Sequence, residues 1–119
     1  MPATFSSFYP ERIGARLPLG RDFFDHFSPA DWIITNPPWS LIRPFLCHSY
    51  ELADNIAFLM TINHVWTKAR LRDMNTHGFG LREILLVETP REFPPTGFQL
   101  GMVHYQRNFS GKITLSRLP

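Results

Sequence analysis

Residues 31–40, DWIITNPPWS, decide the fold and the chemistry that this chain suggests. Residues 32–34 form a continuous apolar run, which is typical of a strand that is covered on both faces. Proline fixes its own φ and has no N–H, and it holds the residue before it in an extended conformation. Pro37 and Pro38 therefore predict a stiff turn at the end of the strand, in which oxygen acceptors, including the Asn36 side chain, outnumber the donors.

Such a turn suits a planar group that carries an exocyclic amine. Asn36 and the nearby backbone carbonyls offer acceptors to the amine, and Trp39 offers a flat face for stacking. An extruded nucleobase is a group of this kind. Two structural alternatives stay open from the sequence: a rigid Pro-Pro turn that only closes a strand, and Trp39 as a core aromatic that opens the next helix.

The composition predicts one folded domain. The chain has 119 residues, of which 44% are hydrophobic and 14% aromatic, so it is a globular chain and not a disordered tail. A net charge of +2 permits nucleic-acid contact without requiring it. The single cysteine, Cys47, excludes an internal disulfide and lies in an apolar helical pattern, which favours a buried thiol over a nucleophile. The five histidines lack metal-ligand spacing, so we expect no metal site. The sequence has no long apolar run and no secretory signal, so we expect a soluble, cytoplasmic protein.

Apolar residues at helical spacing follow the turn: Ile42, Phe45, Leu46, Ser49, Leu52 and Ala53. Ser40 is the expected N-cap of this helix, and Pro44 falls in its first turn, where proline is tolerated. The next apolar run, residues 56–62, predicts a second strand, so that the region forms a β-α-β unit.

The remainder of the chain continues the alternation and predicts an α/β domain with an open, mostly parallel sheet. Residues 1–20 read as irregular and residues 89–99, with three prolines and Gly97, read as a loop. The other expected elements are a short helix at about 64–75, strands at 83–87 and 101–107, and a tail strand at 112–115.

The motif Asn-Pro-Pro-aromatic, placed between an apolar strand and a helix, resembles the catalytic motif of the S-adenosylmethionine (SAM) dependent amino-methyltransferases. It is most similar to that of the N6-adenine DNA methyltransferases, especially the small phage-type ones. The resemblance covers about residues 20–110. It implies a partial Rossmann-like class I methyltransferase fold ending in an antiparallel hairpin, SAM as the cofactor, and the N6 amine of adenine in DNA as the acceptor.

The resemblance also implies roles for single residues of the turn and of the cofactor site. Asn36 and the carbonyl of Pro37 would accept hydrogen bonds from the adenine amine, in a turn held by Pro38, and Trp39 would stack on the base. The implied cofactor contacts are Asp22, Phe23, Asn36 and Phe45. A surface Asp22 before a core Phe23, and a purely packing role for Phe45, are the structural alternatives.

Further residues are implied to contact the substrate. Phe93 and Phe98 lie in a loop that closes over the target base in related enzymes, and Lys68, Arg70 and Arg72 would neutralise phosphates. Anchoring of the loop on the core, and a merely solvated basic face, remain open as alternatives.

One part of the family pattern is missing. Complete enzymes have a strand and a Gly-rich turn that hold SAM before this region, but only about twenty irregular residues precede Asp22, and residues 78–80 (GFG) precede a strand where the family turn follows one. We therefore expect residues 1–119 to form a single domain that corresponds to the C-terminal catalytic half. This half is either a truncated gene product or a chain whose SAM site a second chain or copy completes. Cytosine N4, an RNA base or a protein glutamine as acceptor, and a non-catalytic nucleic-acid-binding relic, also remain open.

Overall fold

The computed structural model describes residues 23–25, 27–92 and 97–118. In chain order the elements, with η for a 3-10 helix, are η2 (Phe23–Asp25), β1 (Ala30–Thr35), η3 (Trp39–Leu41), α2 (Ile42–Leu52), β2 (Ala53–Thr61), η4 (Ile62–His64), α3 (Lys68–Thr76), β3 (Phe79–Val87), β4 (Leu100–Arg107) and β5 (Thr114–Arg117). The expected alternation of strands and helices is therefore present.

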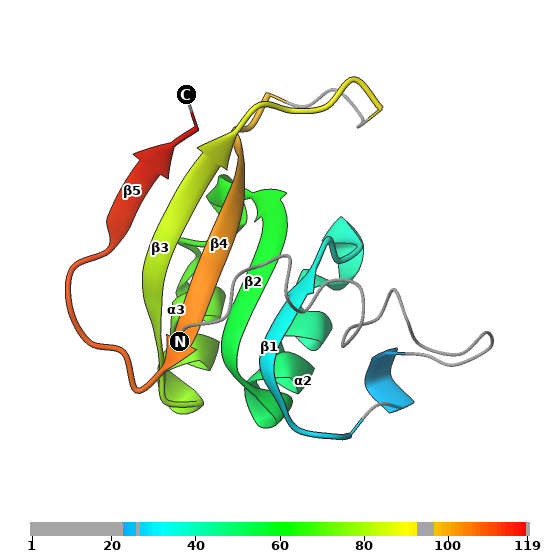
Figure 1. The fold of residues 1–119 in the computed structure, drawn as a ribbon, viewed down its shortest axis with the longest axis vertical. Coiled ribbons are helices and arrows are strands. Elements are labelled where there is room, and N and C mark those ends of the chain that lie inside the picture. The colour runs from blue at the N-terminus through cyan, green and yellow to red at the C-terminus, as the bar shows by residue number, and fades with distance from the viewer. Residues whose placement is uncertain (1–22, 26, 93–96, 119) are drawn as a thin grey trace.

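The strands form one five-stranded sheet in the order β1-β2-β4-β3-β5 (Figure 1). β1 pairs with β2, and β3 with β5, in parallel, whereas β4 is inserted between β2 and β3 and runs antiparallel to both. Four of the strands thus share one direction. The prediction of an open, mostly parallel sheet is confirmed. β3 and β4 form an antiparallel hairpin, but the fold does not end with it, because β5 follows and pairs in parallel with β3.

Both described α-helices, α2 and α3, cover the same face of the sheet (Figure 1). Tyr50 of α2 contacts the sheet there, with its ring centroid 4.6 Å from that of Phe79 and 6.0 Å from that of Tyr105. Side chains alternate along a strand, so the neighbours of Tyr105, His104 and Gln106, lie on the opposite face. Neither helix has the length and apolar composition needed to cross a membrane.

Several boundaries differ from the expected ones. β3 begins at Phe79 and not at residue 83, and β5 covers Thr114–Arg117 and not residues 112–115. Two further differences concern α2 and β2. Ser40 does not cap α2, because it lies inside η3, a turn closed by the Leu41 N–H donating to the Pro38 carbonyl at 2.9 Å. The second strand begins at Ala53 and not at residue 56, because the parallel pairing with β1 starts there, at Ala30 opposite Ala53. Tertiary pairing thus extends a strand through residues with weak strand propensity.

The sheet has two unlike edges. We call the carboxyl edge the one where β1, β2, β3 and β5 end and β4 begins, and the amino edge the opposite one. At the amino edge Arg107 joins β4 to α2 and β2: its Nε donates to Asp54 Oδ1 at 2.8 Å, and its Nη2 donates to the carbonyls of Tyr50 and Ala53 at 3.0 and 2.9 Å. Its guanidinium also lies 4.7 Å from the ring centroid of Phe79.

Candidate active site at the carboxyl edge

The turn at residues 36–39 lies at the carboxyl edge, directly after β1. Pro37 is fully buried, whereas Asn36 and Pro38 are exposed and Trp39 is half-buried. Pro38 has φ −57° and ψ 131°, an extended geometry within the range that its ring imposes. The buried ring of Pro37 anchors the turn, so that the exposed Asn36 side chain is held on a rigid support.

Two oxygen acceptors of this turn are left for a ligand. The Pro38 carbonyl is used by the Leu41 N–H. Among the described residues, no turn or side-chain hydrogen bond engages the Asn36 side chain or the Pro37 carbonyl. Ligands of open α/β sheets bind at the carboxyl ends of the strands, so these acceptors lie where a ligand is expected.

Trp39 has a divided environment. Its ring packs against the hydrophobic core beside α2, yet the residue stays half-buried. The core contact predicted as the structural alternative is therefore present, and part of the side chain remains accessible next to Asn36. A stacking role for Trp39 stays a prediction that this placement permits.

Phe23 and Phe45, two of the residues with an implied cofactor role, lie together. Their rings stack at 4.9 Å with an interplanar angle of 8°, and the His48 ring meets Phe23 edge-on at 5.0 Å. Phe23 is only 7% exposed, so this cluster fixes η2 against α2. Asp22 lies outside the described residues, and the cofactor role of Phe23 and Phe45 stays a prediction.

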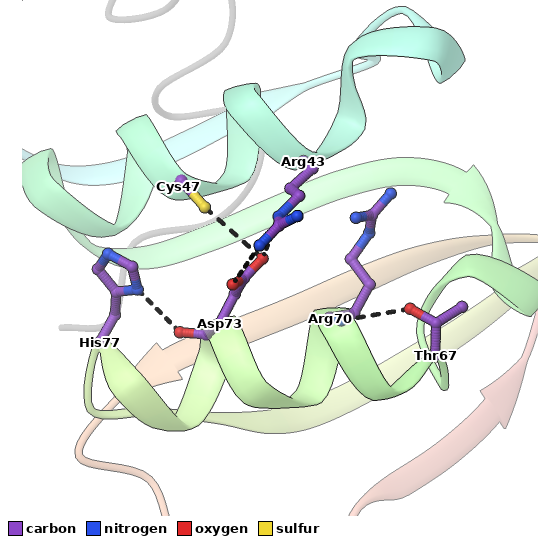
Figure 2. A network of polar contacts seen from close by, with 6 residues as sticks. All are labelled: Arg43, Cys47, Thr67, Arg70, Asp73 and His77. Carbon is purple, nitrogen blue, oxygen red and sulfur yellow. Dashed lines mark hydrogen bonds and ion pairs between the residues drawn. The ribbon is translucent and has the colours of Figure 1, made fainter.

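The three basic residues of α3 do not lie on one side of the helix. Lys68 and Arg72 are exposed and four residues apart, which places them on the same side. Arg70 points the other way, toward α2, as Figure 2 shows. Its Nε is buried, with no hydrogen-bond partner among the described residues. A shared role in phosphate binding is therefore geometrically consistent for Lys68 and Arg72 only.

An ion pair joins α2 to α3 next to Arg70 (Figure 2). Arg43 donates from Nε and Nη2 to the Asp73 carboxylate at 2.8 and 3.2 Å, and this contact lowers the pKa of Asp73. Cys47 Sγ lies 3.8 Å from the same carboxylate, and burial raises the pKa of its thiol, which keeps it protonated. In the described ranges no three His, Cys, Asp or Glu side chains gather into a metal site.

The loop between β3 and β4 also reaches the carboxyl edge. Phe98 is 57% exposed, whereas Phe93 lies outside the described residues. Phe98 lines an open pocket of about 1250 Å³ at the ends of β3 and β5, together with Leu86, Val87, Glu88, Thr89, Gly97, Gln99, Arg117 and Leu118. The pocket and the Asn36 turn share an edge but lie at opposite ends of it.

A polar network on the face opposite the helices was not predicted. His104 Nε2 lies 2.9 Å from Asn55 Oδ1, which also accepts from Gln106 Nε2 at 3.1 Å, and Arg82 donates to Gln106 at 2.7 Å. The His104 ring stacks on Trp32 at 4.6 Å. Burial and the positive charge of Arg82 lower the pKa of His104 to about 4, so the ring is neutral at pH 7 and donates to Asn55. The alternation of polar residues in an otherwise apolar β4 is the sequence signal that points to it.

Comparisons with known proteins agree at the level of the fold. No family model and no curated protein matches the sequence. A candidate RNA methyltransferase, PH1948 from Pyrococcus horikoshii, matches 75% of this chain and 47% of its own, with a TM-score of 0.51 and 21% identity. M1.HpyAVI, solved as a complex with SAM, matches 79% of this chain and 60% of its own, with a TM-score of 0.46 and 13% identity.

The shared feature is the fold. This chain shares its fold with part of the PH1948 chain. It spans about half the length of the PH1948 chain that it matches.

Proposed function

We propose that this chain is the catalytic half of a SAM-dependent methyltransferase that transfers a methyl group to the N6 amine of adenine in DNA. The observation that carries the proposal concerns two acceptors at the carboxyl edge beside Trp39, the Asn36 side chain and the Pro37 carbonyl. Within the part of the chain that the structure describes, no turn or side-chain hydrogen bond uses either of them. The motif resemblance supports the same reaction.

The turn acts on the amine by hydrogen bonding and orientation. The lone pair of an adenine amine is delocalised into the ring, which makes the nitrogen a poor nucleophile. The two N–H groups of the amine would donate hydrogen bonds to Asn36 Oδ1 and to the Pro37 carbonyl. These bonds favour a more pyramidal nitrogen with an available lone pair. Because Pro37 and Pro38 fix the acceptors before the substrate binds, little reorganisation accompanies the reaction. Trp39 holds the ring plane by stacking.

The residues present fit part of a SAM site. SAM, when bound, supplies a methyl group attached to a positively charged sulfur. A turn rich in oxygen acceptors suits a positive group, and the apolar rings of Phe23 and Phe45 suit an adenine moiety. Of the turn residues, Asn36 would face the cofactor as well as the base.

We place the remaining SAM contacts outside the described residues, on a second chain or copy. No described strand pairs with the outer edge of β1. An edge strand with free backbone donors and acceptors is a template for pairing with a further strand. A partner that adds strands there would bring its own loops to the same carboxyl edge.

A methyl-transfer assay on a single-stranded oligonucleotide with one adenine tests the proposal, with and without candidate partner chains. Asn36→Ala should lower the rate by at least about 100-fold, the usual effect of removing one preorganised hydrogen-bonding group. Ser40→Ala, an exposed neighbour in η3, is the matched control and should stay within about twofold. Undiminished transfer by Asn36→Ala contradicts the assigned role.

The same assay separates the acceptors. The DNA oligonucleotide with one adenine should be a better substrate than three others. These are a DNA oligonucleotide whose sole amine is cytosine N4, an RNA with the sequence of the adenine oligonucleotide, and a peptide that contains glutamine. If none accepts a methyl group, and titration calorimetry with millimolar SAM shows no heat, the chain is a non-catalytic relic and the proposal is wrong.

A further inference from the structure

Aromatic side chains stand on three connections along the carboxyl edge. Trp39 follows β1, and Trp66 lies in the turn between η4 and α3, beyond the end of β2. Phe98 lies in the connection from β3 to β4, two residues before β4 begins. Trp66 is 48% exposed and Phe98 is 57% exposed. A single exposed aromatic residue is unremarkable, but the exposed Trp66 and Phe98 and the half-buried Trp39 share one edge with the Asn36 turn. We call them the aromatic track.

We propose that the carboxyl edge binds single-stranded DNA, with Trp66 and Phe98 stacking on bases that flank the target base at Asn36. This inference rests on the proposed function, because that function supplies the nucleic acid. Aromatic platforms beside basic groups are the usual means of holding single strands, and each stacked base contributes ~1–3 kcal/mol. Stacking needs no base pairing, so an unpaired strand is the ligand that this surface favours.

The length of the aromatic track suits a few nucleotides. Neighbouring strands lie ~4.8 Å apart, so the ends of β1 and β3, separated by β2 and β4, are about 14 Å apart. At ~3.4 Å per stacked nucleotide this distance holds about four bases, or about two where an aromatic ring inserts between them. The target base and its nearest neighbours fill that span.

Phe98, at one end of the aromatic track, lines the pocket described above. Hydrogen bonds within the protein orient a polar side chain of this pocket. Gln99 Nε2 donates to the carbonyls of Val87 and Leu100, both at 2.8 Å. Both amide hydrogens are thereby used, which leaves Oε1 as the atom that accepts from a ligand. Glu88, a further residue with acceptor oxygens, lines the same pocket. A base that carries an exocyclic amine matches these acceptors.

Positive charges accompany the aromatic track. Lys68 is exposed at the start of α3, two residues after Trp66, and Arg117 lines the pocket at the end of β5. Both are placed to contact phosphates, which fix the register of a strand without reading its sequence. Binding should therefore weaken as salt is added.

Fluorescence anisotropy with a labelled single-stranded octanucleotide that contains one adenine tests the inference on the full chain, without SAM. Trp66→Ala and Phe98→Ala should each raise Kd by about 5- to 100-fold, the effect of losing one stacked base. Phe27→Ala is the matched control: Phe27 is 72% exposed but precedes β1 at the amino edge, so Kd should not change. Lys68→Gln removes one of the proposed phosphate contacts, so it should raise Kd and reduce the salt dependence of binding. Lys112→Gln, in the β4–β5 connection at the amino edge, is its control and should leave both unchanged.

Unchanged Kd in both Trp66→Ala and Phe98→Ala overturns the inference, as does an equal loss in Phe27→Ala. Tighter binding of duplex DNA overturns the single-strand assignment, and tighter binding of an RNA of the same sequence overturns the assignment to DNA. If an alanine variant does not fold, Trp66→Leu and Phe98→Leu keep apolar volume and remove the stacking face, so they should show the same rise in Kd.

The two proposals fail in different ways. A chain whose DNA binding depends on Trp66 and Phe98 but that transfers no methyl group contradicts only the proposed reaction. A chain that transfers the methyl group, and does so at wild-type efficiency in Trp66→Ala and Phe98→Ala on the same octanucleotide, contradicts only the aromatic track.

Discussion

The amino and carboxyl edges of this sheet are built for different tasks. At the amino edge Arg107 satisfies two backbone carbonyls and the Asp54 carboxylate, and Gly80 leaves room for the Phe109 backbone. At the carboxyl edge, no turn or side-chain hydrogen bond among the described residues engages the Asn36 side chain, and Trp66 and Phe98 are exposed. The hydrogen bonds of Arg107 and the close contact at Gly80 thus lie away from the Asn36 turn. Substitutions at the two edges should therefore separate stability from activity.

The largest expected loss of stability is at Gly80. A Cβ at this position would overlap the carbonyl oxygen of Phe109, and backbone cannot move aside cheaply. Gly80→Ala should lower the free energy of unfolding by about 3 kcal/mol or more, measured by urea denaturation. Gly97→Ala, at the carboxyl edge, meets nothing within 4 Å and should change it by less than about 0.5 kcal/mol. Equal losses at the two glycines contradict the contrast between the edges.

The network around His104 should make stability depend on pH. The pKa of His104 is about 4 in the folded chain, against an ordinary value of 6.5. Between pH 4 and 6.5 the His104 ring is therefore protonated in the unfolded chain and neutral in the folded chain. Stability is full above about pH 6.5 and should fall by about 2–3 kcal/mol as the pH drops to 4. His104→Gln should flatten this part of the profile, measured by urea denaturation at each pH. An unchanged slope in the variant means that another group is responsible.

Arg107 should contribute less than the Gly80 contact but more than any single exposed residue. Arg107→Gln removes charge-assisted hydrogen bonds to the carbonyls of Tyr50 and Ala53, and should lower the free energy of unfolding by about 2 kcal/mol. Arg117→Gln, at the carboxyl edge, is its control and should be near neutral. The comparison weakens if the two arginines prove equivalent in thermal and urea unfolding.

The smallest effect on stability is expected at Asn36, the residue with the largest expected effect on methyl transfer. Its side chain is exposed and holds no turn hydrogen bond among the described residues. Asn36→Ala should therefore change the free energy of unfolding by less than about 0.5 kcal/mol, measured by urea denaturation beside the activity assay. A large loss would show that the residue supports the fold, and its activity loss would then not be evidence of chemistry.

The residues around the Asn36 turn were predictable from sequence because the signals are local. A continuous apolar run predicts a covered strand, two prolines predict the turn, and helical spacing predicts α2. Ser40 shows the limit: its type favours an N-cap, but the 3-10 turn closed on Pro38 moves the start of the helix to Ile42. The start of the helix depends here on how the turn packs, and residue propensities for helix capping carry no information about that packing.

Long-range pairing explains most of what was not predicted. Arg70 looked equivalent to Lys68 and Arg72 in sequence, but helical geometry turns it toward α2, where Asp73 already pairs with Arg43. The sequence around Trp66 did not indicate a binding role. The proposed role arises only because the fold places Trp66 at the same edge as Asn36, which is 30 positions away in the sequence. The Asn55 and His104 contact likewise joins strands 49 residues apart.

The inserted strand β4 has a consequence for engineering new specificities. Because it runs against its neighbours, its first residue, Leu100, lies opposite both Thr61 and Val87. Val87 and Leu100, which flank the connection 88–99, are therefore both paired within the interior of the sheet. A library of replacement segments grafted between Val87 and Leu100 would sample altered substrate preferences on an intact scaffold.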